Sequence, residues 1–497
     1  MALQVYNSMT RTKEVFTPIH APYVGMYVCG PTVSGESHLG HARPYVTFDI
    51  VYRYLQELGY KVRYVRNITD AGHFEEEGKE AEDKVGGKAK LERLEPMELV
   101  QKYTNLFHDA MDALGNLRPS IEPTATGHIP EQIAMIQDMI AKGLAYESNG
   151  SVYFEVRRYA ETEKYGQLSG RVLEEMIAGS RELDGQQEKR DPADFALWKK
   201  APAEHIMRWN SPWGEGFPGW HIECSAMATK YLGKHFDIHG GGMDLQFPHH
   251  ESEIAQSTVC NGCAPVKYWM HNNMITVNGK KMGKSYNNTI TLRELFSGAH
   301  ALLEKAYSPM TVRFLILQTH YRSTLDFSNE ALQSAEKGLA RLMSAANIMK
   351  TFVKGDATKI GTSATDVQIQ KLIAECTQFM DDDFNTAMVL ANLFEMASIA
   401  FVVKNLQLPT GEASEGALAL MANTFERFVY GIFGLQESVQ TSGSKMDDVM
   451  QVLMNIRKEA RAKKDFATSD LIRNQLTEKG ISIKDEKDGT VSWTINE

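Results

Sequence analysis

Cysteine is scarce in this chain, and a long apolar run is missing. Five cysteines in 497 residues cannot form a disulfide scaffold, and they suit a reducing compartment where thiols stay free for metal or substrate. No apolar run approaches the roughly 20 residues of a membrane-spanning helix, and residues 1–16 contain no apolar segment typical of a signal peptide. We therefore expect a cytoplasmic protein that does not enter a membrane.

Positive charge is also outweighed by negative charge. The formal net charge of -10 argues against a coat that binds nucleic acid regardless of sequence, although local basic patches could still bind RNA. The 43% hydrophobic and 23% charged residues are typical of a globular protein. Because 497 residues are too many for one hydrophobic core, we expect about two to four domains.

The stretch 213–253 combines residues that could bind a metal ion. Phe247-Pro248 marks the start of a helix, because proline fits the first helical turn. His249 and Glu253 then stand at positions i and i+4, on one helix face. Cys224 supplies a thiol from elsewhere in the same stretch.

An imidazole, a carboxylate and a thiolate are suitable ligands for Zn²⁺. Cys29, at the end of the apolar run MYVCG, is the other cysteine in a comparable setting and a candidate fourth ligand. The alternative is that Cys224 is a small buried apolar residue and that His249 is only a residue at a helix N-terminus.

The N-terminal region predicts the beginning of a doubly wound α/β sheet. A strand, a loop, a helix and a second strand are expected at 22–30, 31–44, about 45–58 and 61–70. Ligands of such folds bind at the carboxyl ends of the strands. Cys29, the loop around residues 38–41 and Thr69 all fall at such ends, so one pocket could hold them.

Two loops could bind a polyphosphate. In the first, the imidazoles of His38 and His41 lie before a helix N-terminus, and Gly40 would let a flat base approach the backbone. The second loop, 277–288, could close over a triphosphate, with cations and a hydroxyl supplied by Lys281, Lys284 and Ser285. Each motif alone is also compatible with an ordinary polar surface loop.

The C-terminal part of the chain differs from the rest in the spacing of its apolar residues. From about residue 309 the apolar residues follow a helical period, which predicts a helical bundle. A basic cluster and a tryptophan near the C-terminus suit contact with an RNA backbone and base stacking, and they comprise Arg457, Lys458, Arg461, Lys463, Lys464 and Trp493. A small solvated helix and hairpin would give the same pattern.

Taken together, these motifs resemble the cysteinyl-tRNA synthetase family of class I aminoacyl-tRNA synthetases. His38-Leu39-Gly40-His41 is similar to the HIGH motif, and 281–285 (KMGKS) is similar to KMSKS. Further stretches resemble the cysteine-specific members, namely YGQLSG, DPADFALWK, SPWG, PGWHIECSAM, DIHGGG and FPHHE. The resemblance covers nearly the whole chain in the same order. Leu39 and Gly283 depart from the usual isoleucine and serine, and Ala71-Gly72-His73 interrupts a region that is usually more acidic.

The resemblance implies a domain order and an activity. The fold would be an α/β Rossmann-like catalytic domain (1–120 and 205–275) with a connective insertion (121–204). A stem-contact region with the KMSKS loop (276–320), a helical bundle (321–436) and a small mixed α/β anticodon-recognition domain (445–497) would follow. The enzyme would activate L-cysteine with ATP, with Mg²⁺, and transfer it to the terminal ribose of tRNA(Cys), as a monomer.

The resemblance also assigns roles to residues. One zinc ion would be held by Cys29, Cys224, His249 and Glu253, and it would select the thiol substrate over serine. Residues lining the cysteine pocket would be Thr69, Trp220, His239 and Asp244. ATP would be bound, and its reaction assisted, by His38, Gly40, His41, Lys281, Lys284 and Ser285. Rival interpretations are a zinc hydrolase, a ligase that joins cysteine to a small amine, and a non-enzymatic RNA-binding protein.

Overall fold

The chain divides into two compact units, Met1–Gln436 and Glu437–Glu497. The computed structural model describes residues 2–71, 88–89, 94–173, 188–203, 205–283, 286–352, 359–405, 413–437, 442–463, 465–485 and 491–495.

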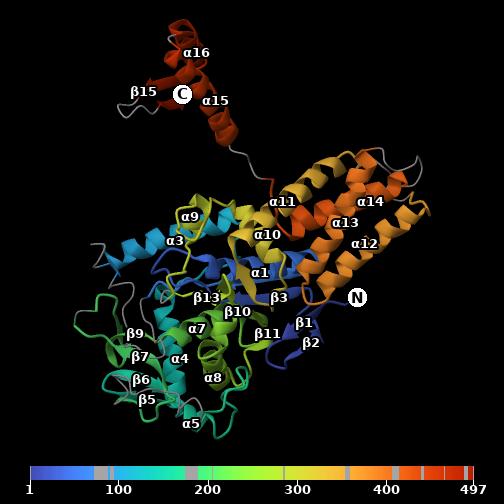
Figure 1. Cartoon of the computed structure of the whole chain (residues 1–497). Coiled ribbons are helices and arrows are strands. Elements are labelled where there is room, and N and C mark those ends of the chain that lie inside the picture. Colours follow the sequence, from blue (N-terminus) through green and yellow to red (C-terminus); the bar gives the residue numbers. More distant parts are fainter. Residues whose placement is uncertain are drawn as a thin grey trace. The chain divides into compact units, whose positions relative to one another are not determined.

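A four-stranded parallel sheet lies in the first unit, in the order β11-β10-β3-β4 (Figure 1). Its strands are β3 (Tyr23–Val28), β4 (Lys61–Arg66), β10 (Phe236–Gly242) and β11 (Val266–Asn272). Most residues of the two central strands, β3 and β10, are buried, as in parallel sheets that are covered by helices on both faces. The predicted doubly wound α/β fold is confirmed.

The direction of winding reverses between β3 and β10. Helix α1 (Leu39–Glu57) connects β3 to β4, and α8 (His249–Asn261) connects β10 to β11 in the opposite direction. Because such crossovers are right-handed, the two helices lie on opposite faces of the sheet, with α7 (Trp220–Leu232) beside α8 (Figure 1). Ligands bind at this kind of reversal, outside the carboxyl ends of the two central strands.

Helix α1 begins earlier than the sequence predicted. The expected start near Tyr45 is wrong, because the helix begins at Leu39, with His38 as the residue that precedes it. Pro44 was taken as the end of a loop, yet inside the helix its missing N–H removes only one hydrogen bond. The buried side chains of Leu39 and Ala42 and the hydrogen bond from His38 N to His41 Nδ1 (3.2 Å) support the extra turn.

A second sheet is antiparallel, in the order β5-β6-β7-β9-β8. Its strands are β5 (Ala145–Ser148), β6 (Ser151–Phe154), β7 (Phe195–Lys200), β8 (Trp209–Ser211) and β9 (Gly214–Pro218). Strands β5 and β6 form a hairpin, with Asn149 and Gly150 at positive φ in its turn.

The expected return to the parallel sheet at about residue 205 is wrong. Strand β9 pairs with β7, and β8 pairs with β9, so that the parallel sheet resumes only at β10. Two glycines allow the close approach to β7. A Cβ on Gly216 would lie 2.3 Å from the carbonyl oxygen of Lys199, and one on Gly219 would lie 2.1 Å from that of Ala196.

Short elements complete the α/β part of the first unit. The hairpin β1-β2 (Gln4–Asn7 and Thr12–Val15) and the small sheet β13-β12-β14 (Lys280–Lys281, Ile275–Val277 and Leu325–Phe327) are separate from the two larger sheets. Further helices before the bundle, among the described residues, are α3 (Pro96–Ala113), η1 (Thr126–His128), α4 (Ile129–Ala141), α5 (Val156–Tyr159), η3 (Met243–Gln246) and α9 (Leu292–Ser297).

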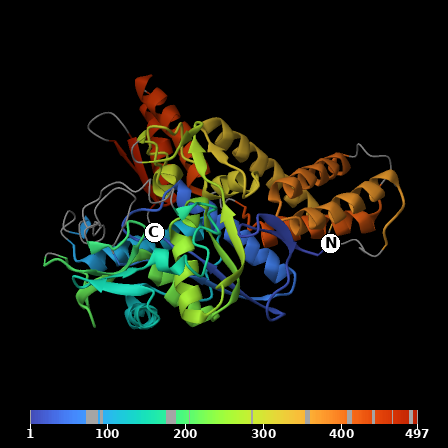
Figure 2. The same ribbon diagram turned by 90° about the horizontal axis from the view of Figure 1, so that it is seen from below.

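A helical bundle follows, as predicted, and it is orange in Figures 1 and 2. It consists of α11 (Asn329–Met349), α12 (Ala364–Asp381), α13 (Thr386–Lys404) and α14 (Glu415–Glu426), and α10 (Pro309–Leu317) packs against α11. A π-helical turn, η5 (Arg427–Ile432), comes after α14. Among the described residues, α13 alone has the length and composition of a membrane span, and half of its apolar window is buried.

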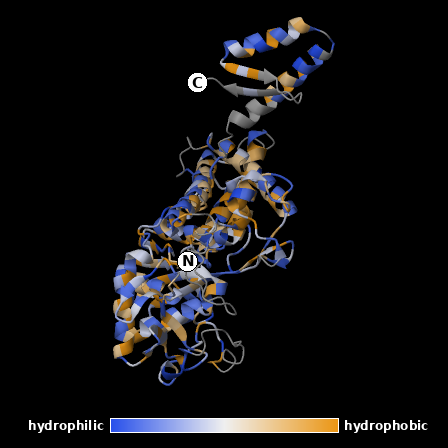
Figure 3. Ribbon diagram, turned by 90° about the vertical axis from the view of Figure 1, so that its left-hand side faces the viewer, coloured by the Kyte–Doolittle hydropathy of each residue, from blue (hydrophilic) through white to orange (hydrophobic). Residues whose placement is uncertain are grey.

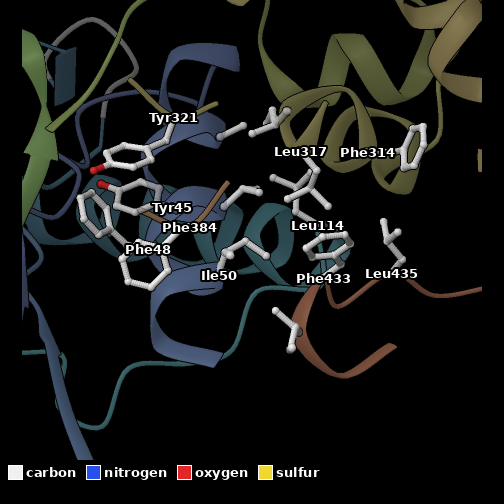
Figure 4. Close-up of a cluster of buried hydrophobic side chains, with 14 of the residues drawn as sticks. Tyr45, Phe48, Ile50, Leu114, Phe314, Leu317, Tyr321, Phe384, Phe433 and Leu435 are labelled. Atoms are coloured by element: carbon white, nitrogen blue, oxygen red, sulfur yellow. The ribbon is translucent and has the colours of Figure 1, made fainter. Parts of the chain in front are cut away.

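One hydrophobic core connects the parallel sheet to the bundle. Figure 4 shows side chains from α1 (Phe48), α10 (Leu317), the turn after α3 (Leu114) and the end of the first unit (Phe433) gathered in one cluster. All four residues are at most 2% exposed. Helix α1 is therefore packed against the segment that ends the first unit.

The second unit contains α15 (Ser442–Ala462), α16 (Phe466–Glu478) and the hairpin β15-β16 (Ile481–Asp485 and Val491–Ile495). Its small core is formed by Met450, Met454 and Ile481, with Trp493 packed against them. The helices of this unit carry hydrophilic and hydrophobic residues in alternation (Figure 3). The predicted mixed α/β fold of the C-terminal segment is confirmed.

Candidate metal centre and nucleotide site

The four predicted metal ligands lie together at the reversal between β3 and β10. Cys29 directly follows β3, Cys224 lies on α7, and His249 and Glu253 lie on α8. One ligand atom from each residue is within 4.8 Å of the ligand atoms of the other three. All four side chains are buried, none more than 8% exposed.

The contacts among these ligands shift their pKa values. The two sulfur atoms are 3.9 Å apart, and His249 Nε2 lies 3.1 Å from Glu253 Oε1. Burial raises the pKa of Cys29, whereas the hydrogen bond with Cys29 lowers the pKa of Cys224. Burial alone would lower the pKa of His249, but the Cys224 thiolate and the Glu253 carboxylate raise it. A divalent cation bound among these donors would displace the protons of the thiols and the imidazole.

The donor set suits zinc. Two thiols, one imidazole and one carboxylate are the ligand types found in four-coordinate zinc sites. The residues therefore fit the metal that their chemistry predicted.

A second group overlaps the first. Cys29, His239, His250 and Glu253 also have ligand atoms within 4.8 Å of one another. His250 Nε2 lies 3.3 Å from Cys29 Sγ, and its Nδ1 is 2.8 Å from His271 Nε2. This group has only one sulfur, so the set with two thiols is the better match for zinc.

His239 contacts a predicted metal ligand. It was predicted to line the cysteine pocket, and its Nε2 lies 2.9 Å from Glu253 Oε2 while its ring stacks on Trp269 at 4.6 Å. Burial would raise the pKa of Glu253, but His239 and then His249 lower it. Such an outer hydrogen bond orients a carboxylate ligand and keeps it ionised.

The other residues predicted for the cysteine pocket lie nearby. The ring of Trp220 is 4.4 Å from that of His249. Thr69 is buried and donates to Glu223 Oε2 (2.8 Å). Glu223 directly precedes Cys224 in α7. Asp244 is exposed in η3, two residues beyond β10.

The first nucleotide motif forms the beginning of α1. The rings of His38 and His41 stack with their centroids 3.9 Å apart. Burial, and then the neighbouring His38, lowers the pKa of His41 to about 3. His41 is therefore neutral near pH 7, and it can donate one N–H rather than supply a positive charge.

The segment directly after the second motif is hydrogen-bonded to the first. Leu39 N donates to Ile290 O (3.0 Å), and Leu292 N donates to Ser37 O (2.8 Å). Lys281 is exposed at the end of β13, and Lys284 and Ser285 lie outside the described residues. The two motifs, more than two hundred residues apart in the sequence, are thus adjacent in the fold.

Gly40 lies where the two motifs meet. A Cβ at this position would be 2.7 Å from Met282 Cε and 3.0 Å from the His38 ring. Gly40→Ala tests the predicted ATP site: the displaced His38 imidazole would no longer meet the phosphates in the correct position, and we expect the KM for ATP to rise about tenfold. Pyrophosphate exchange at varied ATP measures this effect.

Gly35→Ala is the matched control for this substitution. A Cβ on Gly35 would lie 3.5 Å from Lys88 Nζ, an ordinary contact with a mobile side-chain end. Gly40→Ala should leave zinc content unchanged and should not destabilise the helix, since alanine favours helix formation. An unchanged KM for ATP in Gly40→Ala would show that the position of the His38 imidazole does not matter for ATP binding.

The C-terminal basic cluster is only partly on the surface. Lys458, Arg461 and Lys463 are exposed, whereas Arg457 is 4% exposed and so departs from the predicted RNA-binding surface. Trp493 was expected to be exposed, but it packs against the small core of its unit. A count of basic and aromatic residues in the sequence could not reveal that these two side chains lie partly or wholly inside the unit. Lys464 lies outside the described residues.

Several residues at the site were missed from the sequence. Asn288 is buried and bridges the loop 277–288, called the lysine loop below. Its Oδ1 accepts from Gly283 N (2.9 Å) and its Nδ2 donates to Lys281 O (3.0 Å). Asn67 Oδ1 accepts from Gly30 N (2.8 Å) beside Cys29. The tandem histidines 249–250 could have indicated His250, but no sequence signal distinguishes these asparagines from ordinary polar residues.

Family models match most of the chain. Residues 15–337 match the class I (C) tRNA synthetase catalytic domain, residues 376–437 match the DALR domain, and residues 444–492 match the cysteinyl-tRNA ligase anticodon binding domain.

Curated relatives are similar along their whole length. The chain is 56% identical over 498 residues to a cysteine–tRNA ligase of Bacteroides fragilis, and 48% identical over 507 residues to one of Chlorobaculum tepidum. In both cases the match covers 99% of this chain and 99% of the relative.

Solved structures share the fold at low identity. Methionyl-tRNA synthetase of Mycobacterium tuberculosis with methionyl-adenylate has a TM-score of 0.59 at 13% identity, covering 83% of this chain and 92% of that one. A leucyl-tRNA synthetase complex of Agrobacterium radiobacter has a TM-score of 0.60 at 12% identity, covering 84% and 85%.

Proposed function

The chain belongs to the cysteinyl-tRNA synthetases, and we propose which of its residues serve each step of the reaction. It is a cysteine–tRNA ligase that uses ATP to activate L-cysteine as cysteinyl-adenylate and then transfers the cysteine to tRNA(Cys). The observation that supports this proposal most directly concerns the carboxyl ends of β3 and β10. The metal ligands lie there together with the start of α1, which carries the first nucleotide motif and is called the nucleotide helix below.

We assign one zinc ion per chain to Cys29, Cys224, His249 and Glu253. Zinc bound there would favour a thiolate strongly over an alcohol and so separate cysteine from serine, which differ by one atom. His239 holds the Glu253 carboxylate in place through its hydrogen bond. Thr69, Trp220 and Asp244 complete the proposed cysteine pocket.

Activation consists mainly of positioning and charge stabilisation. The cysteine carboxylate attacks the α-phosphorus of ATP, and pyrophosphate leaves. The phosphates would be held by His38, His41, Lys281, Lys284 and Ser285, with Gly40 leaving room for the nucleotide and Mg²⁺ accompanying ATP. The terminal ribose hydroxyl of tRNA then attacks the adenylate, so no side chain has to act as a nucleophile.

The second unit is the proposed tRNA-binding module. Lys458, Arg461 and Lys463 are exposed on or just after α15 and could contact the RNA backbone, together with Lys464. We also propose that the enzyme works as a monomer in the cytoplasm.

Cysteine-dependent exchange of pyrophosphate into ATP, with serine as the control, tests this function together with charging of tRNA(Cys). We expect exchange with cysteine alone and cysteine-specific charging. No exchange with either amino acid would contradict the activation chemistry and favour a zinc hydrolase or an RNA-binding protein. Exchange without charging would favour a ligase that joins cysteine to a small amine.

A further inference from the structure

A buried carboxylate on the nucleotide helix connects three other segments of the first unit. Asp49, in α1, is 2% exposed. Its Oδ1 accepts from Leu117 N (2.8 Å), in the turn after α3. Its Oδ2 accepts from Arg53 Nε (2.7 Å) and is paired with Arg313 Nη2 from α10.

The two guanidinium groups extend this connection to the end of the first unit. Arg313 donates through Nε to Phe433 O (2.6 Å) and through Nη1 to Asn116 Oδ1 (2.7 Å). Arg53 donates through Nη1 to Gly431 O (3.1 Å) and through Nη2 to Gly115 O (2.8 Å). One carboxylate and two guanidiniums therefore hold α1, α10, the turn 114–117 and the segment 431–433 together.

This arrangement opposes any shift of the four segments relative to one another. Arg313 is fully buried, so each of its hydrogen bonds would be lost without replacement by water if a segment shifted. The guanidinium donors form a rigid planar fork, which fixes direction as well as distance. The four segments are held in one relative position.

The backbone at the end of the unit is shaped to fit this group. Gly434 has a φ of 57°, and a Cβ there would lie 2.8 Å from Arg313 Nη2 and 2.9 Å from Arg53 Cζ. A Cβ on Gly115, with φ at 73°, would lie 3.0 Å from the carbonyl oxygen of Gly434. Only residues without a side chain fit at these two contacts.

The group connects the helix that carries the nucleotide motif with the end of the first unit. Helix α1 begins with the stacked imidazoles of the nucleotide motif, and segment 431–433 lies just before Gln436, where the first unit ends. The match to an anticodon-binding domain begins at residue 444. The last segment of the first unit is therefore fixed to α1 through this group.

We propose that Asp49, Arg53 and Arg313 are positioning residues that couple tRNA binding by the C-terminal unit to the nucleotide helix. The inference rests on the tRNA-binding role proposed above. These residues would keep the segment 431–433, from which the chain continues to the C-terminal unit, fixed on α1, so that tRNA bound by that unit is delivered to the active site for the transfer step. Activation of cysteine in the absence of tRNA would not need the coupling.

Arg53→Met tests the coupling, because the Arg53 side chain is 14% exposed and its loss should be tolerated better than that of Arg313. Three rates are compared: exchange without tRNA, charging of full-length tRNA(Cys), and charging of an acceptor minihelix without an anticodon arm. We expect exchange and minihelix charging within about twofold of wild type, and kcat/KM for full-length tRNA lower by about tenfold.

Arg53→Lys should give an intermediate loss, since it retains the charge beside Asp49 but cannot reach both carbonyl oxygens. Arg63→Met is the matched control, because Arg63 is exposed and donates to Tyr231 O (3.1 Å) away from α1. Equal losses in all three assays, equal losses with tRNA and minihelix, or no loss at all would each overturn the proposal. If wild type charges no tRNA, the proposed function itself fails.

Discussion

Cys224→Ser is expected to lose bound zinc and cysteine activation together. The serine hydroxyl is far harder to ionise than a thiol and is a much weaker zinc ligand. The remaining three donors would hold the metal weakly, and we expect cysteine-dependent pyrophosphate exchange to fall by about 100-fold or more. Metal analysis of the purified protein and the exchange assay measure the two losses on the same sample.

Cys263→Ser serves as the control, since Cys263 is exposed and is not one of the candidate ligands. It should retain zinc and exchange at the wild-type level. If Cys224→Ser activates cysteine and still rejects serine, the zinc ion does not make the distinction between the two amino acids. Loss of zinc with unchanged exchange would lead to the same conclusion.

Gly30→Ala should damage the centre of the fold as well as the site. A Cβ on Gly30 would lie 1.4 Å from the carbonyl oxygen of Asn67, a backbone atom that cannot turn aside. The ends of β3 and β4 would have to separate, and the hydrogen bond from Gly30 N to Asn67 Oδ1 would be strained. We expect a loss of about 3 kcal/mol or more in the free energy of unfolding. Denaturant unfolding measures it.

The same substitution should lower zinc content, because Cys29 is the preceding residue and would move with the strand end. Gly35→Ala, whose added Cβ makes only an ordinary contact, is again the matched control. A Gly30→Ala protein with wild-type unfolding midpoint and full zinc content would show that the strand ends can separate freely.

The sequence predicted the parts of the fold that repeat a local pattern. The strand-helix-strand order at the N-terminus indicated a doubly wound sheet, because buried parallel strands and crossover helices have distinct periodicities. The i and i+4 spacing of His249 and Glu253 indicated a shared helix face, and their side chains lie 3.1 Å apart. Cys29 and Cys224 followed from ligand chemistry.

Contacts between distant segments were beyond prediction. The pairing of β9 with β7 depends on glycines that allow close approach, and glycine has other roles in most sequences. The hydrogen bond of His239 to Glu253 and the span of Asn288 across the lysine loop depend on strand ends meeting in space. The burial of Arg457 depends on which face of α15 meets the small core.

The two candidate sulfur ligands are 195 residues apart in the sequence, with the inserted antiparallel sheet between them. An ion bound by both sulfurs would close this stretch into a ring. The entropic cost of closing a flexible ring grows only with the logarithm of its length, about 0.6 kcal/mol for each doubling. The insertion could therefore lengthen or shorten over evolution with little penalty at the centre, provided that its two ends stay fixed.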